Sequence, residues 1–200
     1  MGSSADYSLL LANINKHISP NADEADFFKS IIQFRNLPKK SFLQREGEPC
    51  QMINWVQSGA LRAFYVDHEG RDSTIMFAIR DWWVTDMHAF ANRRTAMQHI
   101  VAIEDSQVFQ LSRDHFEKLL GKVPTFERYF RIIFQNAYIR EQLRVLQSLS
   151  ITAEERYLQF LEKYPQLIPH ITQKQIASYL GVSPEFLSVV RKKMAKKKIS

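Results

Sequence analysis

The sequence predicts an α+β protein in which a jelly-roll-like β-roll (a double-stranded β-helix) is followed by a long helix and a helical C-terminal region. Three observations predict it. Turn residues divide residues 33–111 into short β-prone runs, helical periodicity returns after Ser112, and most of the net positive charge lies in the last fifty residues. With 200 residues, 45% of them hydrophobic, the chain is long enough to bury a sizeable core.

The first segment, residues 7–32, has the loose amphipathic pattern of helices. A second start signal lies inside it, where Ser19 is expected to be the N-cap and Pro20 the first helical residue. Acidic residues, which favour a helix N-terminus, follow in the early turns.

The next region has the pattern of an antiparallel β-domain. Leu61, Ala63 and Tyr65 alternate with the residues between them, as in a strand of an antiparallel sheet. Strands and turns recur at a spacing of roughly ten residues, which favours a small sandwich or a jelly-roll barrel. The expected strands cover residues 53–57, 60–66, 72–79, 99–104 and 106–112.

Helical periodicity then returns. Residues 112–121 predict a short helix with Ser112 as its cap and Gly121 as its stop. From Pro124 a long helix is expected to continue to Ser150, because this run contains neither Gly nor Pro after its start.

One face of this long helix has a heptad seam, which predicts a parallel homodimer. Its residues recur at spacings of three and four, and Asn136 suits a polar pair that sets the register. A second apolar stripe on another face favours contact both with the helix's own domain and with a partner. A helix buried inside a single-chain core stays open as the alternative. The seam consists of Tyr129, Ile132, Asn136, Ile139, Leu143 and Leu146.

The last fifty residues predict a helix-turn-helix. A helix over residues 152–163 precedes it. Thr172 caps the first helix of the motif, and Gly181 supplies the left-handed turn residue. Ser183 then caps the second helix, with Pro184 at its first position. The pattern resembles the helix-turn-helix of bacterial repressors and activators, with an ordinary helical hairpin in a core as the alternative.

The charge of this region indicates double-stranded DNA as the partner. Residues 151–200 hold nine Lys or Arg and four Asp or Glu, which places +5 of the total +6 there. In the docking mode of the motif the second helix enters the major groove, where Glu185 can accept from a cytosine amino group and Ser188 can bond either base type. The expected DNA-contacting residues are Gln173, Lys174, Ser183, Pro184, Glu185, Ser188, Val189, Arg191, Lys192 and Lys196.

Together with a Gly47-Glu48 turn, a Ser58-Gly59 hairpin and an Asp67–Gly70 hairpin, these features resemble the Crp/Fnr family of bacterial transcription regulators over essentially the whole chain. The resemblance implies a cyclic-nucleotide-binding-like sensing β-roll, in which a small-molecule effector shifts two DNA-reading heads, and a contact with RNA polymerase. The implied domains are the β-roll (1–123), the dimerisation helix (124–150) and the DNA-binding domain (151–200). Relatives usually continue into a small β-wing, whose phosphate contacts we expect the lysine tail (196–198) to replace.

The family's phosphate cassette is altered in this chain. Nucleotide-binding members carry Gly-Glu and Arg-Ser or Arg-Thr, because a guanidinium must neutralise the cyclic phosphate. Thr85-Asp86 and Ala96-Met97 stand at these positions here. Cyclic AMP is therefore not the expected effector unless Arg93 or Arg94 reaches in, and an apolar or aromatic molecule is favoured. The expected pocket residues are Trp82, Trp83, Thr85, Asp86, Arg93, Arg94 and Met97.

Other function classes have weaker support. The single cysteine, Cys50, excludes an internal disulfide framework and a multi-cysteine zinc or iron–sulfur site. A cupin-like metal-dependent enzyme using His88 and His99 near Asp86 is the enzyme alternative, but no nucleophile elbow or phosphate loop accompanies them. We expect no enzyme and no metal. Without a basic leader or a run of about 18 apolar residues, no membrane contact is expected and the predicted location is the cytoplasm.

Overall fold

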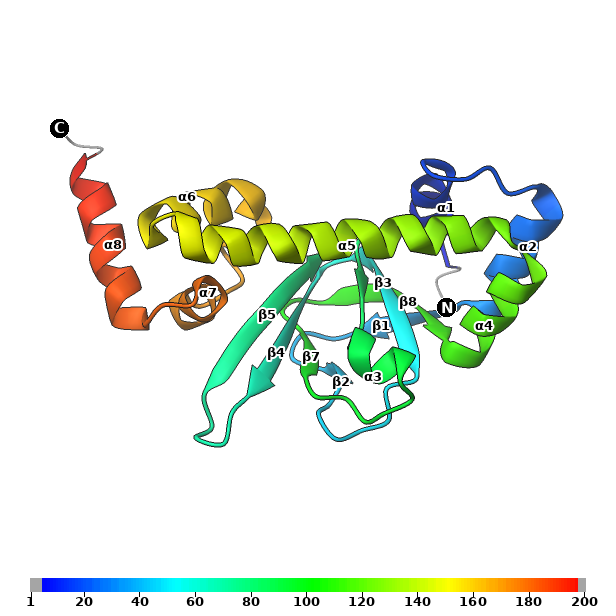
Figure 1. The fold of residues 1–200 in the computed structure, drawn as a ribbon, viewed down its shortest axis with the longest axis horizontal. Coiled ribbons are helices and arrows are strands. Elements are labelled where there is room, and N and C mark those ends of the chain that lie inside the picture. Colours follow the sequence, from blue (N-terminus) through cyan, green and yellow to red (C-terminus); the bar gives the residue numbers. More distant parts are fainter. Residues whose placement is uncertain (1–4, 198–200) are drawn as a thin grey trace. The chain divides into compact units, whose positions relative to one another are not determined.

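The computed structural model describes residues 5–197, with the backbone alone for residues 195–197 (Figure 1). The chain forms two compact units. The first comprises the chain up to Ala63 together with Phe77–Ala137, and the second comprises Phe64–Met76 and the chain from Tyr138 onward. The boundary between the units falls inside three elements, β4, β5 and α5. The predicted domain limits at residues 123 and 150 stay a prediction.

Two helices open the first unit, α1 (Ser8–Asn15) and α2 (Ala22–Ile31). The expectation that Ser19 caps the second helix was wrong, because Asn21 is the N-cap. The Asn21 side chain accepts from the Glu24 N–H at 2.9 Å, and the Glu24 carboxylate accepts from the Asn21 N–H at 2.9 Å. This reciprocal capping box satisfies two backbone donors and moves the helix start two residues beyond Pro20.

Two four-stranded sheets form the β-roll. One has the order β1-β8-β3-β6 and the other the order β2-β7-β4-β5. The pairings of β8 with β1 and β3, of β3 with β6, and of β2 with β7 are antiparallel. The strands are β1 (Gln33–Leu37), β2 (Phe42–Gln44), β3 (Met52–Ser58), β4 (Ala60–Val66), β5 (Asp72–Ile79), β6 (Trp83–Val84), β7 (His99–Ala102) and β8 (Ser106–Ser112). The predicted α+β class with a jelly-roll-like β-roll is confirmed.

The turn between β3 and β4 requires glycine. Gly59 has a φ of +83°, and a Cβ there would lie 2.7 Å from the Asp105 carbonyl oxygen and collide with the Ser106 side chain. The Ser106 hydroxyl oxygen instead accepts from the Ala60 N–H at 3.2 Å and donates to the Glu104 carbonyl at 2.8 Å. The predicted Ser58-Gly59 hairpin therefore ties β4 to the start of β8.

Helices α3 (Met87–Ala91), α4 (Arg113–Lys122) and the first half of α5 (Thr125–Ser150) complete the first unit. Helix α4 continues through Gly121, which was expected to stop it. Aromatic rings fill the core, and the Phe28 and Phe126 rings stack at 4.9 Å. Burial of each such side chain stabilises the fold by about 1.5–3 kcal/mol.

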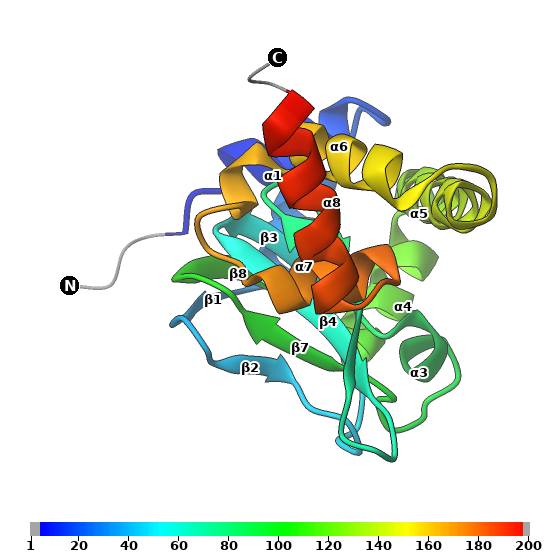
Figure 2. The same ribbon diagram turned by 90° about the vertical axis from the view of Figure 1, so that its left-hand side faces the viewer.

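Helices dominate the second unit. It contains the rest of α5, then α6 (Ala153–Lys163), a short 3₁₀ turn (Pro165–Leu167), α7 (Gln173–Leu180) and α8 (Pro184–Lys197). Helix α8 packs against both α6 and α7 (Figure 2). The rings of Phe160 and Tyr164 lie 5.1 Å apart in the core of this unit. No helix in the described range 5–197 is both long and apolar enough to cross a membrane.

Candidate nucleic-acid interface

The turn between α7 and α8 has the predicted chemistry. The Thr172 side chain accepts from the Gln175 N–H at 3.2 Å and so caps α7. Gly181 ends α7 in the left-handed conformation, with φ 70° and ψ 35°. The Ser183 hydroxyl oxygen accepts from the Phe186 N–H at 3.1 Å, which caps α8 directly before Pro184. These local bonds end α7 and begin α8 with only three residues between the two helices.

Packing fixes which side of α8 faces outward. Leu187 and Val190 are buried against the rest of the second unit, with exposed fractions of 1% and 7%. Ile176, Ala177 and Leu180 form the buried face of α7. The predicted contact residues of α8 lie on the exposed side, and they are Ser183, Pro184, Glu185, Ser188, Val189, Arg191 and Lys192.

Two features of α8 modify the predicted surface. Phe186 is half exposed, a position that the sequence reasoning missed although it lies three residues before Val189. The Glu185 pKa is held below its usual range by its own backbone N–H and by the Ser183 side chain, so Glu185 carries its charge at neutral pH. A charged carboxylate and an apolar pair therefore share the exposed side of the helix.

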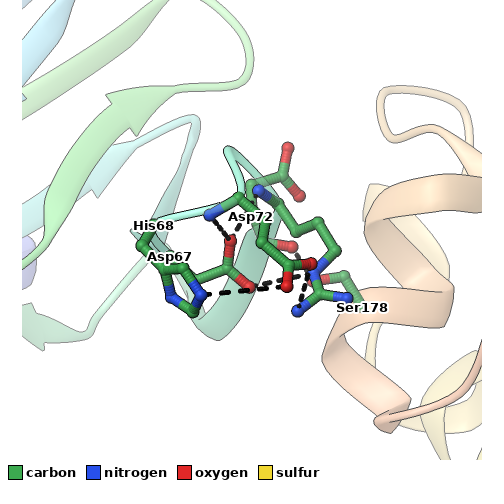
Figure 3. Close-up of polar contacts among 6 residues, drawn as sticks. Asp67, His68, Asp72 and Ser178 are labelled. Carbon is green, nitrogen blue, oxygen red and sulfur yellow. Dashed lines mark hydrogen bonds and ion pairs between the residues drawn. The ribbon is translucent and has the colours of Figure 1, made fainter.

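Helix α7 contacts the hairpin segment, which we define as Phe64–Met76. The Thr74 N–H donates to the Ser178 hydroxyl oxygen at 2.7 Å. The Ser178 hydroxyl in turn donates to the Asp72 carbonyl at 2.9 Å, and Figure 3 shows these two residues side by side. The Thr74 hydroxyl reaches the Gln175 carbonyl at 3.5 Å. Lys174, a predicted phosphate contact, lies 4.0 Å from the Asp72 carboxylate. No sequence signal indicates this contact, because about a hundred residues separate its two sides.

The remaining predicted basic residues differ in their surroundings. Arg191 and Lys192 are exposed, whereas the neighbouring Lys193 ammonium lies 3.3 Å from the Glu154 carboxylate. Gln173 is half-buried at the start of α7. The Lys196 side chain and the end of the lysine tail lie outside the described residues.

The predicted seam on α5 is only partly exposed. Tyr129 is fully buried in the first unit, where its hydroxyl accepts from the Trp83 indole N–H at 2.8 Å and donates to Asn13 at 2.7 Å. This ring is therefore not available to a second chain, and Ile132 is half-buried. The seam is exposed from Asn136 onward, and Tyr138, Val145 and Leu149 add apolar surface that the heptad count missed. The exposed apolar residues of α5 are Tyr138, Ile139, Leu143, Val145, Leu146 and Leu149.

The cassette residues form a closed network around Asp86. Its buried carboxylate accepts from the Ala89 N–H at 3.0 Å, where it caps α3, and from the Met97 N–H at 2.7 Å. The Thr85 hydroxyl donates to the Met52 carbonyl at 2.9 Å. The structure thus brings Asp86 and Met97 together, next to Thr85.

The other expected pocket residues do not converge on this network. Trp83 packs on the core, with its ring 5.4 Å from that of Phe130, and Trp82 is half-buried. Arg93 forms an ion pair with Glu117 at 2.9 Å. Arg94 is exposed, and its backbone N–H donates to the Ala89 carbonyl at 2.9 Å while its carbonyl accepts from the Cys50 N–H at 3.3 Å.

A cyclic nucleotide does not fit these residues. A cyclic phosphate needs unoccupied N–H donors and a guanidinium. The Asp86 carboxylate already takes the N–H groups of Ala89 and Met97, and Ala96 is buried with no charge to offer. Arg93, one of the two arginines expected as a substitute, is paired with Glu117 instead.

The histidines considered for a metal site lie in separate surroundings. The His99 Nδ1 atom accepts from the Glu46 N–H at 3.2 Å, whereas the His88 ring lies next to Asn92. Among the described residues, no group of three or more His, Cys, Asp or Glu side chains is placed to hold a metal ion.

Comparison with known proteins matches this architecture. Residues 34–122 match the family described as "Cyclic nucleotide-binding domain". The chain is 24% identical to an anaerobic regulatory protein of Pasteurella multocida, over 84% of this chain but only 65% of that protein's length. FixK2 from Bradyrhizobium japonicum superposes with a TM-score of 0.72 at 20% identity, covering 84% of this chain and 87% of FixK2. A Crp/Fnr-family regulator from Eubacterium rectale gives a TM-score of 0.72 at 16% identity, with coverage of 89% and 85%.

The first unit is therefore built on a domain of the cyclic nucleotide-binding type, and the chain shares with FixK2 the fold in which helices follow such a domain. In sequence the chain is similar to transcriptional regulators, among them a transcriptional activator protein Anr of Pseudomonas protegens (23% identical, over 90% of this chain and 78% of that protein), and in fold it is similar to solved regulators of the Crp/Fnr type. The cupin-like enzyme hypothesis is set aside.

Proposed function

We propose that the protein is a dimeric DNA-binding transcriptional regulator in which residues 183–193 form the recognition helix. One observation carries this proposal: α8 is buried only on the side of Leu187 and Val190, and its opposite side is exposed beside basic residues. A helix fixed in this way can lie in the major groove with its first turns at the base edges. In this proposal residues 1–123 sense a small-molecule effector, residues 124–150 form the dimer contact and residues 151–200 bind DNA.

The charges divide the contacts between phosphates and bases. Lys174, Arg191 and Lys192 carry exposed positive groups that suit phosphates, together with Gln173, Lys196 and Ser183. Glu185 and Ser188 are the hydrogen-bonding candidates at base edges. The dimer places two such helices on two half-sites one helical turn of DNA apart.

Dimerisation through α5 is supported by its exposed apolar residues. Ile139, Leu143 and Leu146 are each more than half exposed, which is unusual for three side chains that recur at heptad spacing. Two copies of the helix cover these side chains when they pair in parallel, with Asn136 facing its equivalent.

The effector of this proposal is a small molecule other than a cyclic nucleotide, because Asp86 and Ala96 leave no anion site. The protein acts in the bacterial cytoplasm, and a contact with RNA polymerase is part of the same proposal. Titration calorimetry with cyclic AMP is expected to give no heat of binding. Micromolar binding would contradict this assignment of the cassette.

A mobility-shift titration against genomic fragments at several salt concentrations tests the DNA-binding proposal. We expect sequence-specific binding with a steep salt dependence. Lys192→Ala should weaken binding to all sequences alike and lower the salt slope by about 1 for each lost phosphate contact. Lys39→Ala, at an exposed lysine of the first unit, is the control and should change neither quantity. Absence of DNA binding at low salt would end the proposal.

A further inference from the structure

The exposed side of α8 carries a charged and an apolar side chain next to each other. Glu185 and Val189 are four residues apart, so they lie on the same side of the helix. Val189 is 63% exposed, which is more than Phe186 at 50% on the same helix. Leu187 and Val190, on either side of it in sequence, are buried. Helix packing therefore does not explain why a valine stands at this position.

The surroundings of Val189 favour a polyanion over an apolar protein surface. Arg191 and Lys192 are exposed on the following turn, and Ser188 precedes them. An apolar protein partner would have to desolvate these charges, which is costly without matching groups. DNA instead supplies phosphates for the cations and base edges for the centre of the helix.

Base edges in the major groove offer one apolar group, the C5-methyl of thymine. Valine has no hydrogen-bond donor or acceptor in its side chain, so it cannot select a base by hydrogen bonding. Its two methyl groups can, however, remove a thymine methyl from water. Phe186, half exposed and three residues earlier, extends the apolar surface along the same flank.

We propose that Val189 is a specificity-determining residue that reads the C5-methyl group of a thymine in each half-site. This inference rests on the proposed function, since it needs α8 in the major groove. Glu185 and Ser188 are proposed to recognise bases through hydrogen bonds, whereas Val189 would recognise a base without any hydrogen bond.

Replacement of thymine by deoxyuridine tests the inference, because uracil lacks only the methyl group and pairs identically. Tight-binding duplexes are first selected from a random pool with the full-length protein. Each thymine is then replaced singly by deoxyuridine, and affinity is measured by mobility shift at fixed salt. One thymine in each half-site should be sensitive, with a loss of about fourfold per methyl and roughly 15-fold when both half-sites are changed.

Two variants locate the contact. Val189→Ala should bind thymine and uracil duplexes equally, so that the ratio of the two affinities at the sensitive position falls to one. Lys192→Ala is the matched control on the same side of the helix, and it should weaken both duplexes while keeping their ratio. Because Val189 is exposed, Val189→Ala should keep the melting temperature of the parent protein, which checks that the variant is folded.

The outcomes separate this inference from the function on which it rests. If the protein selects no sequence and binds no duplex, the proposed function fails. If it binds selected DNA but no thymine is sensitive to uracil, or if Val189→Ala keeps the same ratio, the thymine contact is wrong. In that case the exposed Val189 and Phe186 would serve a protein partner instead.

Discussion

Several ionisable side chains are kept neutral by burial. Burial raises the pKa of the Cys50 thiol above its ordinary 9.0 and the pKa values of Tyr129 and Tyr164 above their ordinary 10.0. Above these ordinary values the unfolded chain has released protons that the folded chain still holds. Stability is therefore fully present below about pH 9 and falls as the pH rises further.

Urea unfolding between about pH 8 and pH 10.5 measures this loss. Tyr129→Phe should flatten the decline at the cost of a lower stability at neutral pH, because the Trp83 and Asn13 partners lose their hydrogen bonds. Tyr65→Phe is the control, since Tyr65 is 41% exposed, and its profile should match that of the parent. A parent profile that stays flat up to pH 10.5 would contradict the burial argument.

At the scale of elements, the turn between α7 and α8 depends on backbone conformation. No heavy atom lies within 4 Å of a Cβ placed on Gly181, but its φ of +70° is unfavourable for any side chain. Gly181→Ala should therefore lower the stability of the second unit by about 1–2 kcal/mol. Gly121→Ala is the matched control within a helix, where the same change should stabilise by about 0.5–1 kcal/mol. Thermal unfolding that moves both variants in the same direction would refute this distinction.

The hairpin segment makes a second prediction at this scale. In Ser178→Ala the Thr74 N–H loses its acceptor, so its hydrogen exchange should become faster while exchange within α4 stays unchanged. Ser188→Ala, at an exposed serine of α8, should leave Thr74 protected. An unchanged Thr74 exchange rate in Ser178→Ala would show that this hydrogen bond does not hold the hairpin segment on α7.

Local signals explain how much of these elements could be predicted. Thr172, Gly181 and Ser183 act on backbone groups a few residues away, so the sequence places the turn correctly. The burial of Tyr129 and the pairing of Arg93 with Glu117 depend on residues far along the chain. A heptad pattern records that a position is apolar, but it does not tell whether the same chain or a second chain covers it.

At the scale of the whole molecule, the apolar residues of α5 predict the oligomeric state. Leu143→Glu combined with Leu146→Glu should convert the dimer to a monomer in analytical ultracentrifugation. The same double variant should bind DNA at least tenfold more weakly, because a monomer can occupy only one half-site at a time. Ser148→Glu, at an exposed position on the other side of α5, is the control and should stay dimeric. A monomeric parent protein at micromolar concentration would exclude the seam as an interface.

Strand β5 belongs to both units, and this limits which segments of the protein can be exchanged for those of another. Its first residues, Asp72 and Thr74, form hydrogen bonds with Ser178 of α7, whereas its last residues belong to the other unit. A chimera that transplants only the chain from residue 138 onward would leave Ser178 without its partners. A chimera of this protein therefore has to carry residues 64–76 along with the C-terminal helices, so that three crossover points, after residues 63, 76 and 137, are needed where a linear domain map suggests one.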